Sequence, residues 1–67
     1  MNILLNSESI QLPKELGTVK DLVIWKKIPS QGTAVAVNDK LIPQSQWGVT
    51  QLNDLDRITI ISAAFGG

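Results

Sequence analysis

Residues 33–43 read TAVAVNDKLIP, which predicts two short β-strands joined by a tight turn. From Thr33 to Asn38, valines alternate with alanines, so β-branched side chains line one side of the first strand. Asn38-Asp39 can adopt the positive φ angles of a tight turn. The second strand, Leu41-Ile42, stops at Pro43, which suits the edge of a sheet better than its centre.

A second pair of strands is predicted at the start of the chain. Met1–Asn6 reads as a strand with Ile3 and Leu5 on one face. Asn6–Glu8 supplies turn-forming residues, and alternation resumes over Ser9–Leu12. The connection is short, so these two strands should be antiparallel.

A single helix is predicted after the loop at residues 14–17. Thr18 can cap its N-terminus, with Asp21 three residues later in a variant of the capping box. The helix should run from Val19 to about Lys27, and Pro29 and Gly32 should end it.

This helix should bury one broad face. We expect Ile24 and Trp25 to belong to that face, in preference to forming an exposed binding patch. The residues expected to point inward are Val19, Leu22 and Val23, with Ile28 packing just beyond the helix end.

The last strand is predicted at Arg57–Ala63, with Ile58 and Ile60 on the same face. Before it, residues 45–51 should be irregular or form a single helical turn around Trp47. The indole of Trp47 is expected to close one end of a small core.

The order of elements is strand, strand, helix, strand, short strand, strand. One helix across one face of a mixed sheet encloses a core economically, so the predicted fold class is α+β. We expect the last strand to lie centrally, beside the first. The 67 residues should form one domain, residues 1–67, with a flexible tail at about residues 64–67, and bury about 60% of the unfolded surface.

Composition excludes several function classes. The chain has no Cys and no His, and six basic residues balance six acidic ones. No basic surface is therefore expected for nucleic acid. No apolar run approaches the about 18 residues of a membrane helix, and a cytoplasmic location is expected. Without a recognisable catalytic constellation or metal-ligand cluster, the chain is expected to be a substrate of other enzymes and no enzyme itself.

The sequence ends at Gly66-Gly67. Two residues without Cβ can pass through a narrow channel, which would let a partner enzyme reach the terminal carboxylate. The alternative is a frayed chain end, where glycine is also common.

The chain resembles the ThiS family of sulfur carriers. The resemblance rests on residues 35–43 (VAVNDKLIP), Trp47, the Asp54–Asp56 turn before the last strand, and the diglycine end. It implies a ubiquitin-like β-grasp fold with a mixed four- to five-stranded sheet and one main helix across one face.

The resemblance also implies a chemistry. In such carriers a ThiF-like adenylyltransferase uses ATP and magnesium to convert the terminal carboxylate into an acyl-adenylate. A sulfur relay from a cysteine desulfurase then gives a thiocarboxylate, which supplies sulfur to thiazole synthase. In this chain Gly67 would be the modified residue, and Gly66, which has no side chain, would keep the tail narrow enough to enter the partner's channel.

The chain departs from the family pattern at two places. The family turn usually reads Asp-Gly-Asp, whereas Leu55 stands in the middle here. Leucine resists positive φ, so we expect the bend to shift to Asn53 or Asp54. In the helix, Ile24 and Trp25 occupy positions that are often polar in the family.

Two regions are predicted to meet partner proteins. Phe65 either closes the core at the end of the last strand or anchors the tail at the mouth of a partner's channel. The sheet face opposite the helix should form a docking patch of small and apolar side chains, which are Leu4, Ala34, Ala36 and Ile61.

Other functions remain open at this point. A carrier for another pathway, such as the small subunit of molybdopterin synthase, shares the fold and the diglycine end. A protein modifier joined to lysines through Gly67 is a second alternative, and an interaction module with an inert tail is a third.

Overall fold

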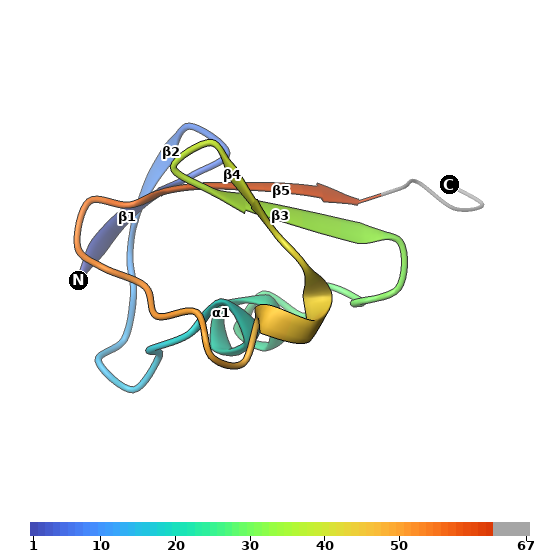
Figure 1. The fold of residues 1–67 in the computed structure, drawn as a ribbon. Coiled ribbons are helices and arrows are strands. Elements are labelled where there is room, and N and C mark those ends of the chain that lie inside the picture. The colour runs from blue at the N-terminus through green and yellow to red at the C-terminus, as the bar shows by residue number, and fades with distance from the viewer. Residues whose placement is uncertain (63–67) are drawn as a thin grey trace.

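The computed structural model describes residues 1–62 (Figure 1). Phe65, Gly66 and Gly67 lie outside the described residues, as does Ala63 at the predicted strand end. The elements in chain order are β1 (Asn2–Leu5), β2 (Glu8–Gln11), α1 (Val19–Trp25), β3 (Thr33–Val37), β4 (Lys40–Ile42), a 3-10 turn η1 (Gln44–Gln46) and β5 (Arg57–Ser62).

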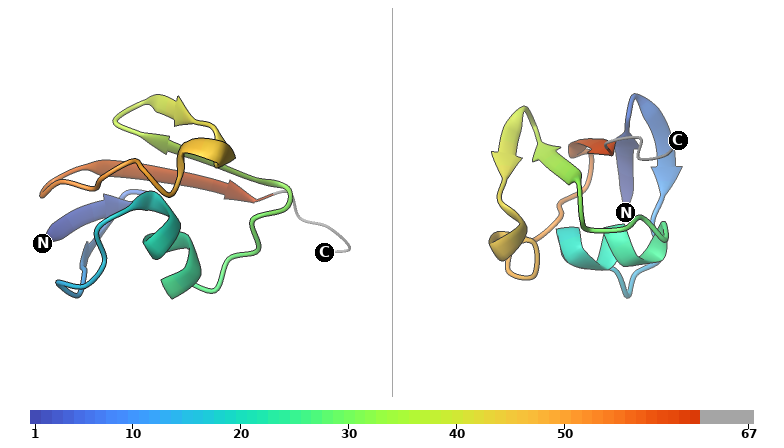
Figure 2. Two further views of the ribbon diagram at one scale, coloured as in Figure 1. Left: turned by 60° about the horizontal axis from the view of Figure 1, so that its bottom comes forward. Right: turned by 90° about the vertical axis from the view of Figure 1, so that its right-hand side faces the viewer.

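The strands form one mixed sheet in the order β2-β1-β5-β3-β4. β1 and β5 are parallel, while the other neighbours are antiparallel. Figure 2 shows α1 lying across one face of this sheet. The β-grasp arrangement and the central position of the last strand beside the first are confirmed, as is the edge position of β4.

Helix α1 begins as its sequence predicts. The Thr18 hydroxyl accepts a hydrogen bond from the Asp21 N–H (3.2 Å), and the Asp21 carboxylate accepts from the Thr18 N–H (3.3 Å). Both bonds of the capping box are present. They satisfy two backbone donors that an α-helix leaves free at its N-terminus.

The helix ends at Trp25, two residues earlier than predicted. Lys27 adopts a φ of 58°, and its N–H donates to the Ile24 carbonyl (2.9 Å). The Ile28 N–H donates to the Val23 carbonyl (3.1 Å). These two bonds form a Schellman motif, in which a residue of left-handed conformation ends the helix. Pro29 therefore follows the helix end and does not cause it.

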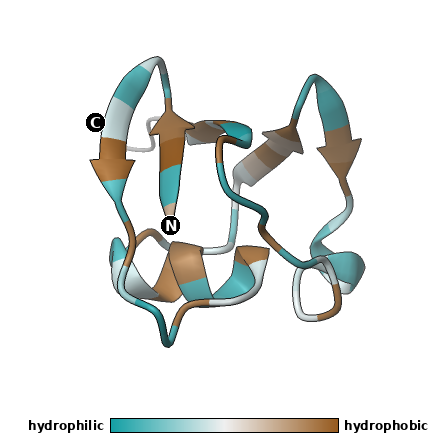
Figure 3. Cartoon of the chain, turned by 90° about the vertical axis from the view of Figure 1, so that its left-hand side faces the viewer, coloured by the Kyte–Doolittle hydropathy of each residue, from teal (hydrophilic) through white to brown (hydrophobic). Residues whose placement is uncertain are grey.

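The core lies between α1 and the sheet. Figure 3 shows apolar segments on the strands and on α1, the two layers that enclose it. The Trp47 indole is buried and donates from Nε1 to the Ile42 carbonyl (3.0 Å), so it closes the core as predicted. The buried apolar residues are Ile3, Leu5, Leu12, Val19, Leu22, Val23, Val35, Trp47, Leu52, Ile58 and Ile60.

The broad buried helix face was a wrong prediction. Ile24 is 62% exposed and Trp25 is 41% exposed. A helix of seven residues on a small sheet buries only the stripe at Val19, Leu22 and Val23. The next residue, Ile24, lies about 100° further around the helix axis and so leaves the core. Ile28 packs against the core, as expected.

The turn before β5 also differs from expectation. Leu55 itself adopts a positive φ of 71°, and the bend does not shift to Asn53 or Asp54. Its N–H donates to the Asn2 carbonyl (2.6 Å), and the Asp54 carboxylate accepts from the Asn2 N–H (2.7 Å). These bonds to the start of β1 fix the turn against the preference of leucine.

Asp56 completes this turn and is buried. Its carboxylate accepts from the Asn53 N–H (2.8 Å) and from Asn38 Nδ2 (2.9 Å). A buried carboxylate requires such partners. The turn is therefore a structural link to the β3–β4 turn and is only partly solvated.

Candidate functional site

The end of β5 is the described part of the chain that lies closest in sequence to Gly66-Gly67. β5 runs between β1 and β3 toward the end of the sheet away from the N-terminus (Figures 1 and 2). Ile61 pairs with Ala34, and Ser62 pairs with Thr33. The Thr33 and Ser62 hydroxyl oxygens are 3.3 Å apart. A central strand with long-range pairing therefore carries the chain to the predicted tail.

The predicted docking patch lies on one face of the sheet. Its four residues, defined above, come from three adjacent strands. Ala34 stands opposite Ile61, and Leu4 stands opposite Arg57 on the neighbouring strand. Directly paired residues point to the same side, and this side is opposite α1. The placement agrees with the alternation in the sequence.

The patch is partly open to solvent and apolar. Ile61 is 64% exposed and Leu4 is 39% exposed. Leu41, opposite Ala36 on β4, is also exposed and extends the patch. Leu41 was not predicted as part of the patch. The Asn38-Asp39 turn gave a signal for it, because pairing across this turn sets Leu41 opposite Ala36. Among residues 1–62, no second layer covers this side of the sheet (Figure 1).

A polar pair borders the docking patch. Arg57 and Asp39 form a salt bridge with an N–O distance of 2.9 Å. Both side chains are exposed, so the pair contributes little to stability. A shallow hollow of about 220 Å³ lies beside it, lined in part by Leu4, Ser7 and Thr59. An apolar centre with a charged border is the usual composition of a protein–protein interface.

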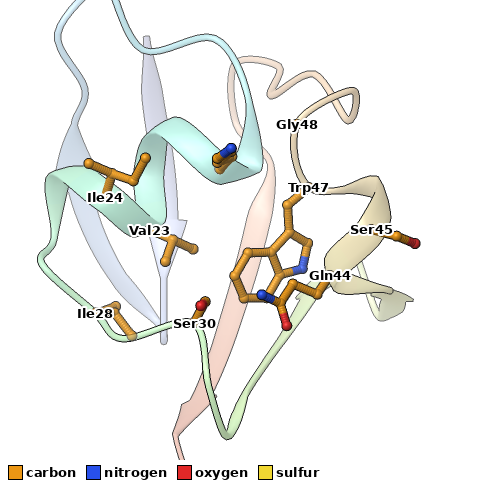
Figure 4. Close-up of a pocket in the computed structure, with 9 residues that line it drawn as sticks. Val23, Ile24, Ile28, Ser30, Gln44, Ser45, Trp47 and Gly48 are labelled. Atoms are coloured by element: carbon orange, nitrogen blue, oxygen red, sulfur yellow. The ribbon is translucent and has the colours of Figure 1, made fainter.

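A larger groove of about 480 Å³ lies on the other side of the molecule, between α1 and the η1–Trp47 segment (Figure 4). Its lining mixes polar and apolar side chains, and Lys20 is the one ionisable residue among the described residues that line it. A single lysine supplies no acid–base pair for catalysis. The lining residues are Lys20, Val23, Ile24, Ile28, Ser30, Gln44, Ser45, Trp47 and Gly48.

Asp21 has a pKa below its ordinary value, and the cause is structural. The Gly17 N–H donates to its carboxylate (3.1 Å) and is the largest contribution, followed among the stabilising bonds by those from Thr18. Hydrogen bonds to the charged form lower the pKa of a carboxyl group. The shift therefore reflects helix capping and identifies no reactive site.

Residues 1–62 offer neither a metal site nor a membrane-spanning helix. Within residues 1–62, no three His, Cys, Asp or Glu side chains are grouped so that they could hold a metal ion. No helix in this range is long and apolar enough to cross a membrane.

Comparisons with known proteins agree with this architecture. The model of the ThiS family matches residues 2–67. A crystal structure of the thiamine biosynthesis protein ThiS from Geobacter metallireducens superposes with a TM-score of 0.83. That protein is 19% identical, and the match covers 100% of both chains. No curated protein matches the chain.

Proposed function

This chain belongs to the ThiS family, and on that basis we propose that it is a sulfur carrier of thiamin biosynthesis. The observation that carries the proposal is the extent of the family match, which runs through residue 67 and includes both terminal glycines. The fold of the described residues supports it, because the central strand β5 leads to that end of the chain.

In the proposed reaction, the Gly67 carboxylate attacks the α-phosphorus of ATP and releases pyrophosphate. This step takes place on a ThiF-like adenylyltransferase with magnesium. A carboxylate oxygen is a poor leaving group, and adenylation makes one of the two oxygens part of AMP, which leaves readily. A sulfur nucleophile from a cysteine-desulfurase relay then displaces AMP. If that nucleophile is the outer sulfur of a protein persulfide, the product is an acyl disulfide between Gly67 and the relay protein. A second thiol of the relay then attacks the relay sulfur of this S–S bond, which forms a disulfide on the relay and releases the Gly67 thiocarboxylate. The thiocarboxylate supplies sulfur to thiazole synthase.

The carrier itself contributes presentation in this proposal. Gly66 and Gly67 have no side chains, so they can enter a narrow active-site channel. Phe65 precedes them and is proposed to contact the mouth of that channel. The folded part, residues 1–62, gives the adenylyltransferase a rigid surface to bind.

The adenylation step is tested by exchange of labelled pyrophosphate into ATP. The purified chain is mixed with the adenylyltransferase of the same organism, ATP and magnesium. Exchange should require the chain and should be lost when Gly67 is deleted, with the thermal midpoint unchanged. A chain that supports no exchange, or that supports it equally well without Gly67, contradicts the proposal.

We also propose that the docking patch binds the adenylyltransferase. A carboxylate placed on an apolar interface loses its hydration without gaining a partner. Ala36→Asp and Ile61→Asp should therefore each weaken binding by about tenfold or more. Ile61 is exposed and Ala36 is half-buried on the sheet face away from the core, so the far-ultraviolet circular dichroism should be retained.

Val49→Asp is the matched control for this experiment. Val49 is apolar and exposed but lies outside the sheet. It should leave the affinity unchanged, as measured by titration calorimetry. Equal affinities for all three variants and the unmodified chain would contradict the docking proposal.

A further inference from the structure

Asn6 makes an unusual set of bonds to β5. It lies in the turn between β1 and β2 and has a φ of 50°. Its backbone N–H donates to the Ile58 carbonyl (2.8 Å). Its side chain then bonds the next residue of β5 on that side: Oδ1 accepts from the Ile60 N–H (2.8 Å), and Nδ2 donates to the Ile60 carbonyl (3.3 Å).

A primary amide carries a carbonyl acceptor and an NH₂ donor on the same carbon, so it can pair with the N–H and C=O of a strand residue as a peptide group does. Main-chain pairing of β1 with β5 reaches only Leu5 opposite Ile58. The Asn6 side chain therefore extends the ladder by two residues, to Ile60. It does so after the backbone of β1 has already turned away.

The peptide groups of β5 bond to different neighbours on the two sides of Ile60. The carbonyls of Asp56 and Ile58 and both backbone groups of Ile60 point toward β1 and its turn. Toward the C-terminus from Ile60, the described pairing of β5 is with β3 alone, at Ile61 and Ser62. Among residues 1–62, Asn6 is thus the last group on the β1 side that bonds the strand leading to Gly67.

We propose that Asn6 is a positioning residue for the C-terminal glycines. The inference rests on the proposed carrier function. By clamping both backbone groups of Ile60, Asn6 fixes the direction in which β5 leaves the sheet. Without this clamp, the described end of β5 beyond Thr59 would be paired with β3 alone. Its additional conformations must then be lost when the tail enters the adenylyltransferase.

The fold contains a matched control for Asn6. Asn38 lies in the other hairpin turn and has a φ of 51°. Its side chain also makes two bonds, to Asp56 Oδ1 (2.9 Å) and from the Arg57 N–H (2.9 Å). These bonds hold the opposite end of β5. Asn38 therefore shares the residue type, turn conformation and number of bonds with Asn6, but not its position near the tail.

The test compares Asn6→Gly with Asn38→Gly. Glycine accepts a positive φ, so each variant keeps its turn and loses only the side-chain bonds. Both should lower the thermal midpoint. Amide hydrogen exchange by NMR reports the clamp directly, and steady-state pyrophosphate exchange reports presentation of the tail.

In Asn6→Gly, the Ile60 amide should exchange about tenfold faster than in Asn38→Gly. The KM for the carrier should rise about fivefold, as expected for ordering one additional residue on binding, while kcat stays within about twofold. In Asn38→Gly, the KM should stay near that of the unmodified chain. Asn6→Asp keeps an acceptor for the Ile60 N–H and should fall between Asn6→Gly and the unmodified chain.

Equal KM values for the two glycine variants, or an unchanged exchange rate at Ile60, would overturn the inference. A failure of the carrier function gives a different pattern. In that case the unmodified chain supports no pyrophosphate exchange with its adenylyltransferase, and the Ile60 exchange rate alone decides whether Asn6 clamps β5. If Asn6→Gly does not fold, the Asn6→Asp comparison decides the inference by the same two measurements.

Discussion

Replacement of Leu55 by glycine should stabilise the fold. Leu55 has a φ of 71°, which glycine adopts freely and leucine does not, and its side chain is 73% exposed. Relief of the left-handed conformation is worth about 1–2 kcal/mol. The greater freedom of glycine in the unfolded chain takes back about 0.4–1 kcal/mol. The midpoints of these two ranges differ by about 0.8 kcal/mol, so the net gain should be near that value, or about 3–6 °C in thermal midpoint for a domain of this size.

Thermal and urea denaturation at pH 7 measure this gain. Leu55→Ala is the first control, because it removes the leucine side chain but keeps the unfavourable φ; its stability should stay close to that of the unmodified chain. Val49→Gly is the second control. Val49 is similarly exposed but has no positive φ, so glycine should destabilise the fold there. A Leu55→Gly variant that is no more stable than Leu55→Ala would refute the assignment of strain to this turn.

Three substitutions in helix α1 and at its C-terminal end should change the stability of the fold. Asp21→Asn should reduce the acid sensitivity of the fold, because folding lowers the pKa of Asp21. The ionised carboxylate stabilises the fold above the pKa of the unfolded chain, about 3.9, and this stabilisation is lost as the pH falls through the pKa of the folded chain. Denaturation at a series of pH values from 7 down to about 2 measures this effect. If the free energy of unfolding falls with pH equally in the variant and the unmodified chain, the prediction is contradicted. Lys27→Gly should raise stability by up to about 1 kcal/mol in urea denaturation, since Lys27 holds the left-handed position of the Schellman motif at a φ of 58°. Leu22→Ala should cost about 2–5 kcal/mol, because Leu22 is fully buried; a cost below about 1 kcal/mol would show that the core is loosely packed there.

Local chemistry predicted much of this fold. The Thr18–Asp21 capping box starts the helix where the sequence places it, and Asn38-Asp39 turns the chain with positive φ values. These signals succeed because the donors, acceptors and allowed backbone angles lie within a few residues of one another. The alternation of valine and alanine in β3 likewise predicted which side chains face the helix.

The remaining features depend on contacts between distant parts of the chain. Leu55 takes a positive φ because Asn2, at the other end of the sequence, bonds both Leu55 and Asp54. The exposure of Ile24 follows from how little of a short helix the sheet can cover. Asn6 gave no signal of its bonds to Ile60, since a turn already explains an asparagine at that position.

The central claim is that Gly67 carries the sulfur, and intact-mass analysis of the protein from its native host tests it most directly. With the adenylyltransferase present, the mass should increase by the replacement of one oxygen with sulfur, and fragmentation should place the change at the C-terminal residue. Without the adenylyltransferase, the mass should equal that of the unmodified chain. An unmodified end under both conditions, or conjugates to lysine alone, would contradict the carrier function.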